Sequence, residues 1–273
     1  MSSGMPLTLP SMIQLSLPEG KKVYFASDFH LGAPNKAASR QREKKIVRWL
    51  EHVSQDASHI FLVGDIFDFW YEYAQVVPKG FIRFQGKLAE LIDKGIEITF
   101  FTGNHDMWMS GYFTEELGIP IYRRPQELYI NDLSIHLAHG DGLGPGDHTY
   151  KMLKVLFESR VLRWCFSRLH PNFSLWFGHK WSVSNKVKHG LKEEFQSIEH
   201  EWLWHYCEEQ EAQQHRNYYL FGHRHLVLDI PVKGGKSRYL NLGEWFEACT
   251  YAVCDGNTVE LRAFENDLTI ANQ

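Results

Sequence analysis

The chain of 273 residues is poor in cysteine, has no long apolar run and carries a net charge of only −4. Its four cysteines lack C-x-x-C spacing and are too few for a disulfide framework in a chain of this length, which fits a reducing compartment. No stretch approaches the roughly 18 consecutive apolar residues of a membrane span. The opening residues lack a basic region followed by an apolar core, which argues against a signal peptide. We therefore expect a protein that stays in the cytosol unless it adheres to a membrane surface.

The near balance of charge hides an uneven distribution. The 29 basic and 33 acidic residues argue against a protein that coats nucleic acid with its whole surface. Residues 151–192 nevertheless contain nine Lys or Arg and one acidic residue, so this segment carries +8 and the rest of the chain −12. The sequence therefore predicts an acidic body with one basic segment.

Apolar, β-rich runs alternate with segments of helical spacing. Strands are predicted within residues 21–27, 59–63, 96–101, 126–131, 133–138, 217–221, 237–242 and 250–264. Helices are predicted at 39–55 and 81–95, the second ended by Gly95. An Asn-Asp turn at 131–132 joins two of the strands. This alternation indicates an α/β fold whose sheet is covered by helices on both faces.

Polar clusters follow these strands: "DFH" (28–30), "GDIFD" (64–68), "GNHD" (103–106), "HGD" (139–141) and "GHRH" (222–225). Because the carboxyl ends of strands in α/β sheets line up on one edge, we expect these clusters to meet there. Seven of their side chains could bind metal: Asp28, His30, Asp65, Asn104, His139, His223 and His225. Oxygen and imidazole donors without thiolate suit Mn²⁺, Fe or Zn²⁺. Seven ligands exceed the needs of one ion but suffice for two that share a carboxylate, for which we choose Asp65 because it ends the most apolar strand.

Taken together and in this order, the five clusters resemble the signature blocks of the calcineurin-like metallophosphoesterases. The resemblance implies a double β-sandwich flanked by helices (α/β/β/α) with a two-metal centre. It assigns one ion to Asp28, His30, Asp65 and His225, and the other to Asp65, Asn104, His139 and His223. It also makes His105 the catalytic histidine and lets Asp106 orient the His105 ring. Asp68 is expected behind the ligands rather than among them.

A basic, aromatic-rich segment interrupts the pattern. We predict a catalytic domain formed by residues 20–147 and 206–265, with an inserted helical cap at 148–205. The cap mixes cations with six aromatic residues: Trp164, Phe166, Phe173, Trp176, Phe177 and Trp181. These aromatics could pack on the main domain, enter a membrane interface or stack on nucleic acid, and composition alone leaves the choice open.

A finer resemblance favours a lipid. "GDIFDFW", "GDHTYKMLK" and the basic insertion before "GHRH" resemble the UDP-2,3-diacylglucosamine pyrophosphatases of lipid A synthesis. This implies release of UMP and 2,3-diacylglucosamine 1-phosphate (lipid X) by two divalent transition-metal ions, with Mn²⁺ preferred. It also implies peripheral attachment to the cytoplasmic face of the inner membrane and no nucleic-acid partner. By this likeness the substrate contacts are Asn104, His105 and Asp147, with Ser184 and Lys188 in the cap.

The chain departs from the best-known members of that group at His105, where they have arginine. Arginine is a permanent cation that grips phosphate, whereas histidine can also transfer a proton. Two alternatives stay open. The first is another phosphoesterase, acting on phosphoprotein or nucleic acid, and the second is a metal-free binding scaffold of the same fold.

Overall fold

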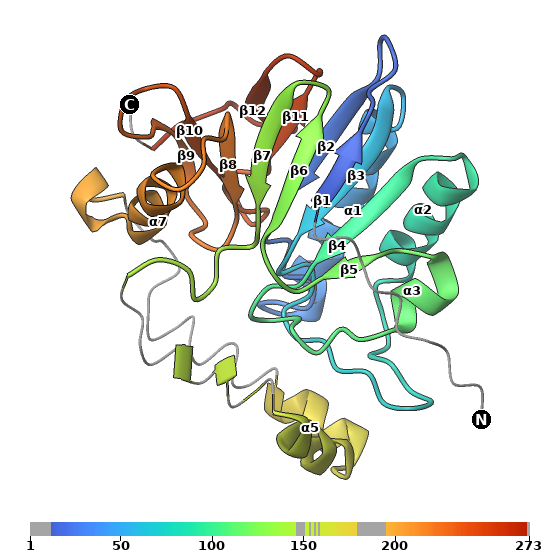
Figure 1. The fold of residues 1–273 in the computed structure, drawn as a ribbon. Helices are drawn as coiled ribbons and strands as arrows, with labels where there is room; N and C mark the ends of the chain where they lie inside the picture. Colours follow the sequence, from blue (N-terminus) through green and yellow to red (C-terminus); the bar gives the residue numbers. More distant parts are fainter. Residues whose placement is uncertain are drawn as a thin grey trace.

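The computed structural model describes residues 12–145, 151–152, 154–155, 157, 159–178 and 195–271. Two six-stranded sheets form its centre (Figure 1). The first sheet contains four neighbouring parallel strands: β2 (Lys22–Ala26), β3 (Ala57–Val63), β4 (Glu97–Phe101) and β5 (Ile121–Tyr122). Two antiparallel strands extend it beyond β2: β11 (Thr250–Cys254) and then β12 (Val259–Ala263).

The second sheet has the order β1-β6-β7-β8-β10-β9. Its strands are β1 (Met12–Leu15), β6 (Gln126–Ile130), β7 (Leu133–Leu137), β8 (Tyr218–Phe221), β10 (Arg238–Leu242) and β9 (Val227–Pro231). The predicted Asn131-Asp132 turn joins β6 to β7, with Ile130 paired to Leu133. The strands β7 and β8 run parallel, although about 80 residues separate them in the chain.

The two sheets pack face to face over a shared apolar layer. From the first sheet this layer receives Phe25, Phe61 and Phe101, and from the second Leu137 and Leu240. Helices α1 (Lys36–Val53), α2 (Ile82–Asp93) and α3 (Tyr112–Leu117) lie on the first sheet's outer side, and α7 (Trp202–Glu211) lies on the outer side of the second (Figure 1). The predicted α/β/β/α sandwich is therefore confirmed.

Local signals account for the helices on the first sheet. Asn35 caps α1, since its side-chain oxygen accepts hydrogen bonds from the backbone of Ala37 and Ala38. The predicted apolar stripe of this helix is buried, at Ile46, Trp49, Leu50 and Val53. Gly95 follows α2 with a φ of 84°, as expected of a residue that ends a helix. Three of the nine tryptophans in the sequence, Trp49, Trp70 and Trp245, are fully buried in the core.

The predicted cap contains helix α5 (Arg160–Ser167), helical residues 171–178 and the short 3₁₀ helix η1 (Ile198–His200). Phe166 packs on Tyr71 and Trp108, with ring centroids 4.7 and 4.8 Å apart. Helix α7 begins at Trp202 and packs on the second sheet through Leu203 and Cys207, so the predicted domain boundary at 205/206 falls inside this helix. No helix among the described residues is long and apolar enough to cross a membrane.

Candidate metal centre

The predicted ligands come directly after five strands. Asp28 and His30 follow β2, Asp65 follows β3, and Asn104 follows β4 in the first sheet. His139 follows β7, and both His223 and His225 follow β8 in the second sheet. The sequence predicted that these side chains meet at one edge. In the structure they do meet, at the ends of strands that belong to both sheets.

One group brings together Asp28, His30, Asp65 and His225, whose potential ligand atoms lie within 4.8 Å of one another. The Nε2 atoms of His30 and His225 are 3.0 Å apart. The Oδ1 atom of Asp28 is 3.2 Å from His225 Nε2 and 3.7 Å from His30 Nε2. These atoms converge on a shared point, as the ligands of one cation do.

A second group contains Asp65, His139 and His223. The Oδ2 atom of Asp65 lies 3.4 Å from His139 Nε2 and 3.7 Å from His30 Nε2, so it faces both groups. Asn104 joins the second group, with Oδ1 3.0 Å from His223 Nδ1. The structure thus gathers all seven predicted ligands into two sets that share Asp65.

In three of these side chains, the polar atom that points away from the other ligands is held by a hydrogen bond to the backbone. Asp28 Oδ2 accepts from the His223 backbone at 3.0 Å, and Asp65 Oδ1 accepts from the His105 backbone at 2.9 Å. His139 Nδ1 lies 2.8 Å from the Val63 carbonyl oxygen, so Nδ1 carries the proton and donates it. The second polar atom of each side chain faces the other ligands and is therefore the one available to bind a metal.

Five of the seven predicted ligands have a left-handed backbone. Nine described residues other than glycine have a positive φ, and the ligands among them are Asp28, His30, Asp65, His223 and His225. This conformation costs roughly 1–2 kcal/mol per residue. Such strain concentrates at functional sites, where the surrounding structure holds it in place.

Glycines allow the ligand loops to approach one another. A Cβ atom added to Gly222 would lie 2.5 Å from Asp28 Oδ2, and one added to Gly103 would lie 2.7 Å from His139 Nε2 and collide with Asp65 Oδ1. A side chain at either position would therefore displace a ligand. The glycine in each of the blocks "GNHD" and "GHRH" is required by space.

Burial and neighbouring charges shift the pKa values of the predicted ligands. Burial raises the pKa of Asp28, but His225 and His30 outweigh it and hold the pKa well below its usual range. Asp65 is likewise buried, and the charge of His139 keeps the pKa of Asp65 well below its usual range. Burial lowers the pKa of His139, but Asp65 outweighs it and raises that pKa to about 10, whereas burial lowers the pKa of His223 to about 4. Two ionised carboxylates are thus present, and a cation would displace the His139 proton.

The donor set fits divalent transition metals. Within the described part of the chain, Asp28 Oδ1 and His139 Nε2 are buried and make no hydrogen bond of good geometry. Buried polar atoms are normally satisfied, so atoms left in this state next to other donors are typical of ligands. Imidazole and carboxylate donors in two groups with one shared carboxylate match a pair of ions such as Mn²⁺, Fe or Zn²⁺.

His105 lies beside the first group, but its neighbours differ from the prediction. Its Nδ1 atom donates to the Asp68 carbonyl oxygen at 2.9 Å, and its ring meets His30 edge to face at 4.7 Å. The carboxylate of Asp106 instead accepts backbone hydrogen bonds from Gly103 at 2.7 Å and Ile66 at 2.8 Å. The orienting role of Asp106 toward His105 stays a prediction. Asp106 ties two loops of the site together, and burial with the charge of Asp65 raises its pKa to about 7.

Asp68 forms a third cluster with His30 and His105, whose potential ligand atoms also lie within 4.8 Å of one another. Its Oδ1 atom is 3.7 Å from His30 Nδ1 and 3.9 Å from His105 Nδ1. Asp68 thus contacts two histidines. Its carboxylate faces the ring of His30, a predicted ligand, and its backbone carbonyl accepts the hydrogen bond from His105, the predicted catalytic histidine.

Two arginines that the sequence did not single out support the ligand loops. Buried Arg42 on α1 donates to the carbonyls of Phe29 at 2.7 Å and His30 at 2.7 Å. Arg224, between two predicted ligands, pairs with buried Glu201 at 3.1 Å and lies over the Trp202 ring at 3.9 Å. Breaking a buried ion pair of this kind costs about 3–5 kcal/mol. Arg42 lies within α1, and Arg224 follows β8 but pairs with Glu201, so no pattern in the sequence marks either role.

Three predicted substrate contacts, Asp147, Ser184 and Lys188, lie outside the described residues. Lys154, from the same block as Asp147, reaches the site, where its Nζ lies 2.7 Å from Asp141 Oδ2. Asp141 belongs to the "HGD" block, so the start of the insertion is tied to the loop that carries His139.

A double β-sandwich whose rim gathers two ligand groups around one aspartate is the architecture of the calcineurin-like metallophosphoesterases. A protein of Porphyromonas gingivalis named UDP-2,3-diacylglucosamine hydrolase is 36% identical over 258 residues, covering 90% of this chain and 98% of its own. One of the same name from Aeromonas hydrophila is 26% identical and covers 84% of this chain and 93% of its own. The chain belongs to the UDP-2,3-diacylglucosamine hydrolase family.

No protein-family model matches the chain. Among solved structures, Vps29 from Cryptosporidium parvum aligns with 90% of this chain and 98% of its own, at 11% identity and a TM-score of 0.42. A likeness at that level carries no argument about function.

Proposed function

We propose that this chain hydrolyses the diphosphate of UDP-2,3-diacylglucosamine and releases UMP and 2,3-diacylglucosamine 1-phosphate (lipid X). The observation that carries the proposal is the convergence of seven side chains into two groups that share Asp65. The relatives named for this substrate support the choice among phosphoesters.

Two divalent transition-metal ions, with Mn²⁺ as our choice, would be held by Asp28, His30, Asp65 and His225 and by Asp65, Asn104, His139 and His223. Once bound, such a pair lowers the pKa of a water molecule and neutralises charge on the phosphoryl oxygens. The Nδ1–H group of His105 donates its hydrogen bond to the Asp68 carbonyl. The other ring nitrogen, Nε2, is therefore the atom that would protonate the leaving oxygen or hold a phosphoryl oxygen. Asn104 and His105 adjoin the site and would contact the substrate, together with Asp147, Ser184 and Lys188.

Product analysis tests the proposal. The purified protein with Mn²⁺ is incubated separately with UDP-2,3-diacylglucosamine, a nicked DNA duplex and a phosphoserine peptide. We expect UMP from the lipid and no cleavage of the other two. Cleavage of DNA or the peptide without UMP release would assign the chain to another phosphoesterase activity, and a protein that binds no transition metal would be a scaffold.

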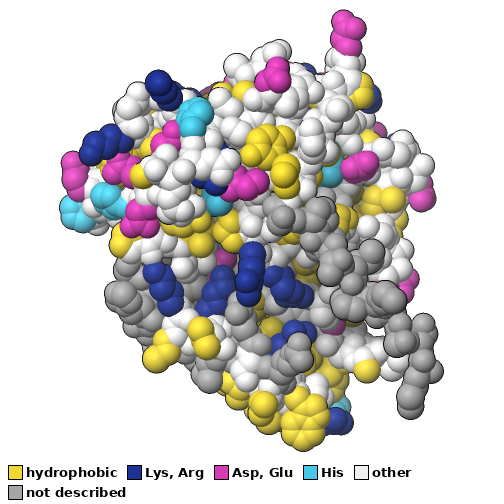
Figure 2. Space-filling model, in the orientation of Figure 1, with side chains coloured by type: hydrophobic (Ala, Val, Ile, Leu, Met, Phe, Trp, Pro, Cys, Tyr) yellow, Lys and Arg dark blue, Asp and Glu magenta, His cyan; other side chains and the backbone are white. Residues whose placement is uncertain are grey.

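We also propose that the cap attaches the protein to the cytoplasmic face of the inner membrane. Its described residues expose Trp164 at 59%, Phe173 at 50% and Trp176 at 53%, and Arg168 lies 4.9 Å from the Trp164 ring. Figure 2 shows apolar side chains at this end of the molecule, next to a group of Lys and Arg. Exposed aromatics beside cations suit a lipid interface with anionic headgroups.

Vesicle sedimentation checks this attachment. Replacing Trp164, Phe173 and Trp176 with serine removes three exposed rings without touching the metal site. We expect at least about tenfold less protein to pellet with vesicles of phosphatidylethanolamine and phosphatidylglycerol, because aromatic burial contributes on the order of 1–3 kcal/mol per side chain. The control is Ile82→Ser, which removes an apolar residue that is 76% exposed on α2. Equal pelleting of the triple variant and the control would contradict the attachment.

A further inference from the structure

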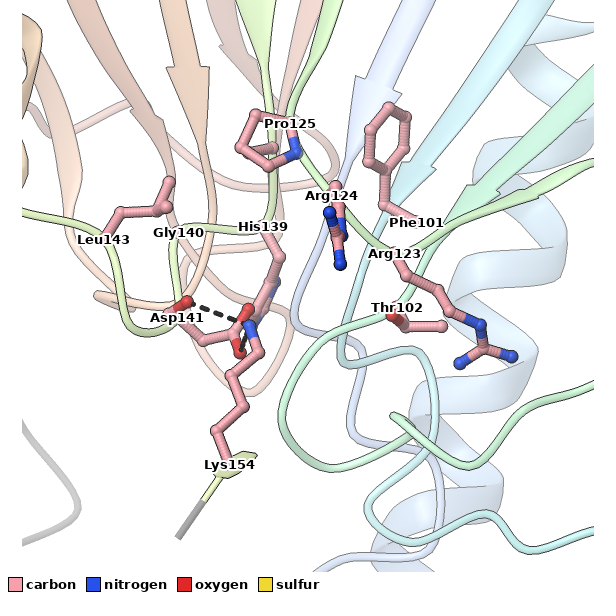
Figure 3. A pocket seen from close by; sticks show the side chains of 11 residues that line it. Phe101, Thr102, Arg123, Arg124, Pro125, His139, Gly140, Asp141, Leu143 and Lys154 are labelled. Carbon is pink, nitrogen blue, oxygen red and sulfur yellow. Dashed lines mark hydrogen bonds and ion pairs between the residues drawn. The ribbon is translucent and has the colours of Figure 1, made fainter. Parts of the chain in front are cut away.

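A hollow opens beside the second ligand group (Figure 3). It lies between the end of β4, the loop before β6 and the loop after β7. His139 belongs both to this lining and to the metal centre, so the hollow adjoins the site of reaction. Its lining residues with side-chain polar groups are Thr102, Arg123, Arg124, His139, Asp141 and Lys154.

The hollow is positively charged. Three cations and one carboxylate line it, which gives a formal charge of +2 with His139 counted as neutral. Lys154 and Asp141 form an ion pair at 2.7 Å. Arg123 is fixed by its own hydrogen bonds to backbone carbonyls, at 2.7 Å from the Met107 oxygen and also at the Met109 oxygen.

Arg124 is the cation best placed to take a ligand. It is exposed, and Figure 3 shows its side chain in the middle of the hollow, between His139 on one side and Arg123 and Thr102 on the other. A guanidinium binds phosphate through two parallel N–H groups and stays protonated throughout the physiological range. Because the hollow adjoins a phosphoesterase centre, we expect the group that it receives to be a phosphate.

We propose that the hollow is a phosphate subsite in which Arg124 binds the second phosphate of the substrate, the one that is not attacked. This inference rests on the proposed hydrolysis of a diphosphate. In that reaction a water oxygen bonds to the uridine-linked phosphorus, and the bond from this phosphorus to the bridging oxygen breaks. The electron pair stays on the bridging oxygen, which leaves as a terminal oxygen of the sugar phosphate with one more negative charge. A permanent cation beside that phosphate stabilises the charge as it grows.

Nucleotide binding tests the subsite without requiring turnover. UDP carries a second phosphate that UMP lacks, so the ratio of their dissociation constants on the Mn²⁺-loaded protein measures the contribution of that phosphate. Calorimetry on the native protein should give UDP at least about tenfold tighter than UMP, as expected of one charge-assisted contact. Arg124→Ala should bring the ratio close to one, and Arg124→Lys should retain part of it. The control is Arg262→Ala, which removes an arginine on β12 that pairs with Glu260.

An undiminished preference of Arg124→Ala for UDP would overturn the subsite. A phospholipid headgroup offers the same phosphate chemistry, so the variant is also pelleted with the vesicles described above. Loss of pelleting with an unchanged UDP preference would assign Arg124 to the headgroup and likewise overturn the proposal. If the native protein releases no UMP from the lipid, the proposed function fails, while the two nucleotides still decide whether the hollow binds a second phosphate.

Discussion

Asp65→Asn should lower hydrolysis at least about 1,000-fold, equivalent to roughly 4 kcal/mol of transition-state stabilisation. Asp65 Oδ2 lies 3.4 Å from His139 Nε2 and 3.7 Å from His30 Nε2, so one carboxylate serves both ligand groups. Two dications held close together repel strongly, and only a shared anionic ligand offsets that repulsion. The amide keeps the size of the side chain and removes its charge. The measurement combines turnover of bis(p-nitrophenyl) phosphate with the metal content per chain, which should fall below two ions.

The control for this variant is Asp93→Asn, which removes an exposed carboxylate at the end of α2. Circular dichroism and the melting temperature of both variants separate a lost site from a lost fold. Asp65→Asn with full activity and two bound ions would contradict the two-ion centre. His139→Ala provides a second test, because it removes a ligand that only the second group contains.

The sequence was sufficient to predict which side chains gather at one edge. Each of them follows an apolar strand, and parallel strands bring their carboxyl ends to a common edge whichever sheet they join. The pattern therefore brought Asp65 and His139 to one edge, although 73 residues separate them, and the resemblance to metallophosphoesterases assigned them to the same ion.

The division into two sheets did not follow from the strand pattern alone, which predicted one sheet covered on both faces. Which strands pair depends on contacts between distant parts of the chain. The strand β11 lies beside β2, more than 200 residues earlier, and β1 lies beside β6. The division into two sheets was predicted only from the resemblance to metallophosphoesterases, because short-range periodicity does not indicate which strands pair.

The sequence also did not predict which residues hold the ligand loops in place. The resemblance assigned Asp106 to orient the His105 ring, whereas in the structure its carboxylate accepts hydrogen bonds from the backbone of Gly103 and Ile66. Spacing along a loop does not reveal which backbone groups need an acceptor. The pairing of Arg224 with Glu201 depends in the same way on where α7 packs.

Gly103→Ala is expected to lower activity at least about 100-fold through one added methyl group. The new Cβ would collide with Asp65 Oδ1 and lie 2.7 Å from both the Asp65 backbone nitrogen and His139 Nε2, so the shared carboxylate must move. Misplacement of reacting groups by about 1 Å can cost a hundredfold in rate. The backbone of Gly103 is not among the left-handed glycines, so the loss is steric. Turnover and metal content of the variant check this.

Gly86→Ala is the matched substitution. Gly86 lies inside α2, and an added Cβ would meet nothing within 4 Å. Alanine should stabilise this helix by about 0.5–1 kcal/mol and leave turnover unchanged, because it is the better helix former and touches no part of the site. Activity of Gly103→Ala within threefold of the native protein would show that the "GNHD" loop tolerates a side chain at this point, and that close packing against Asp65 does not set the ligand geometry.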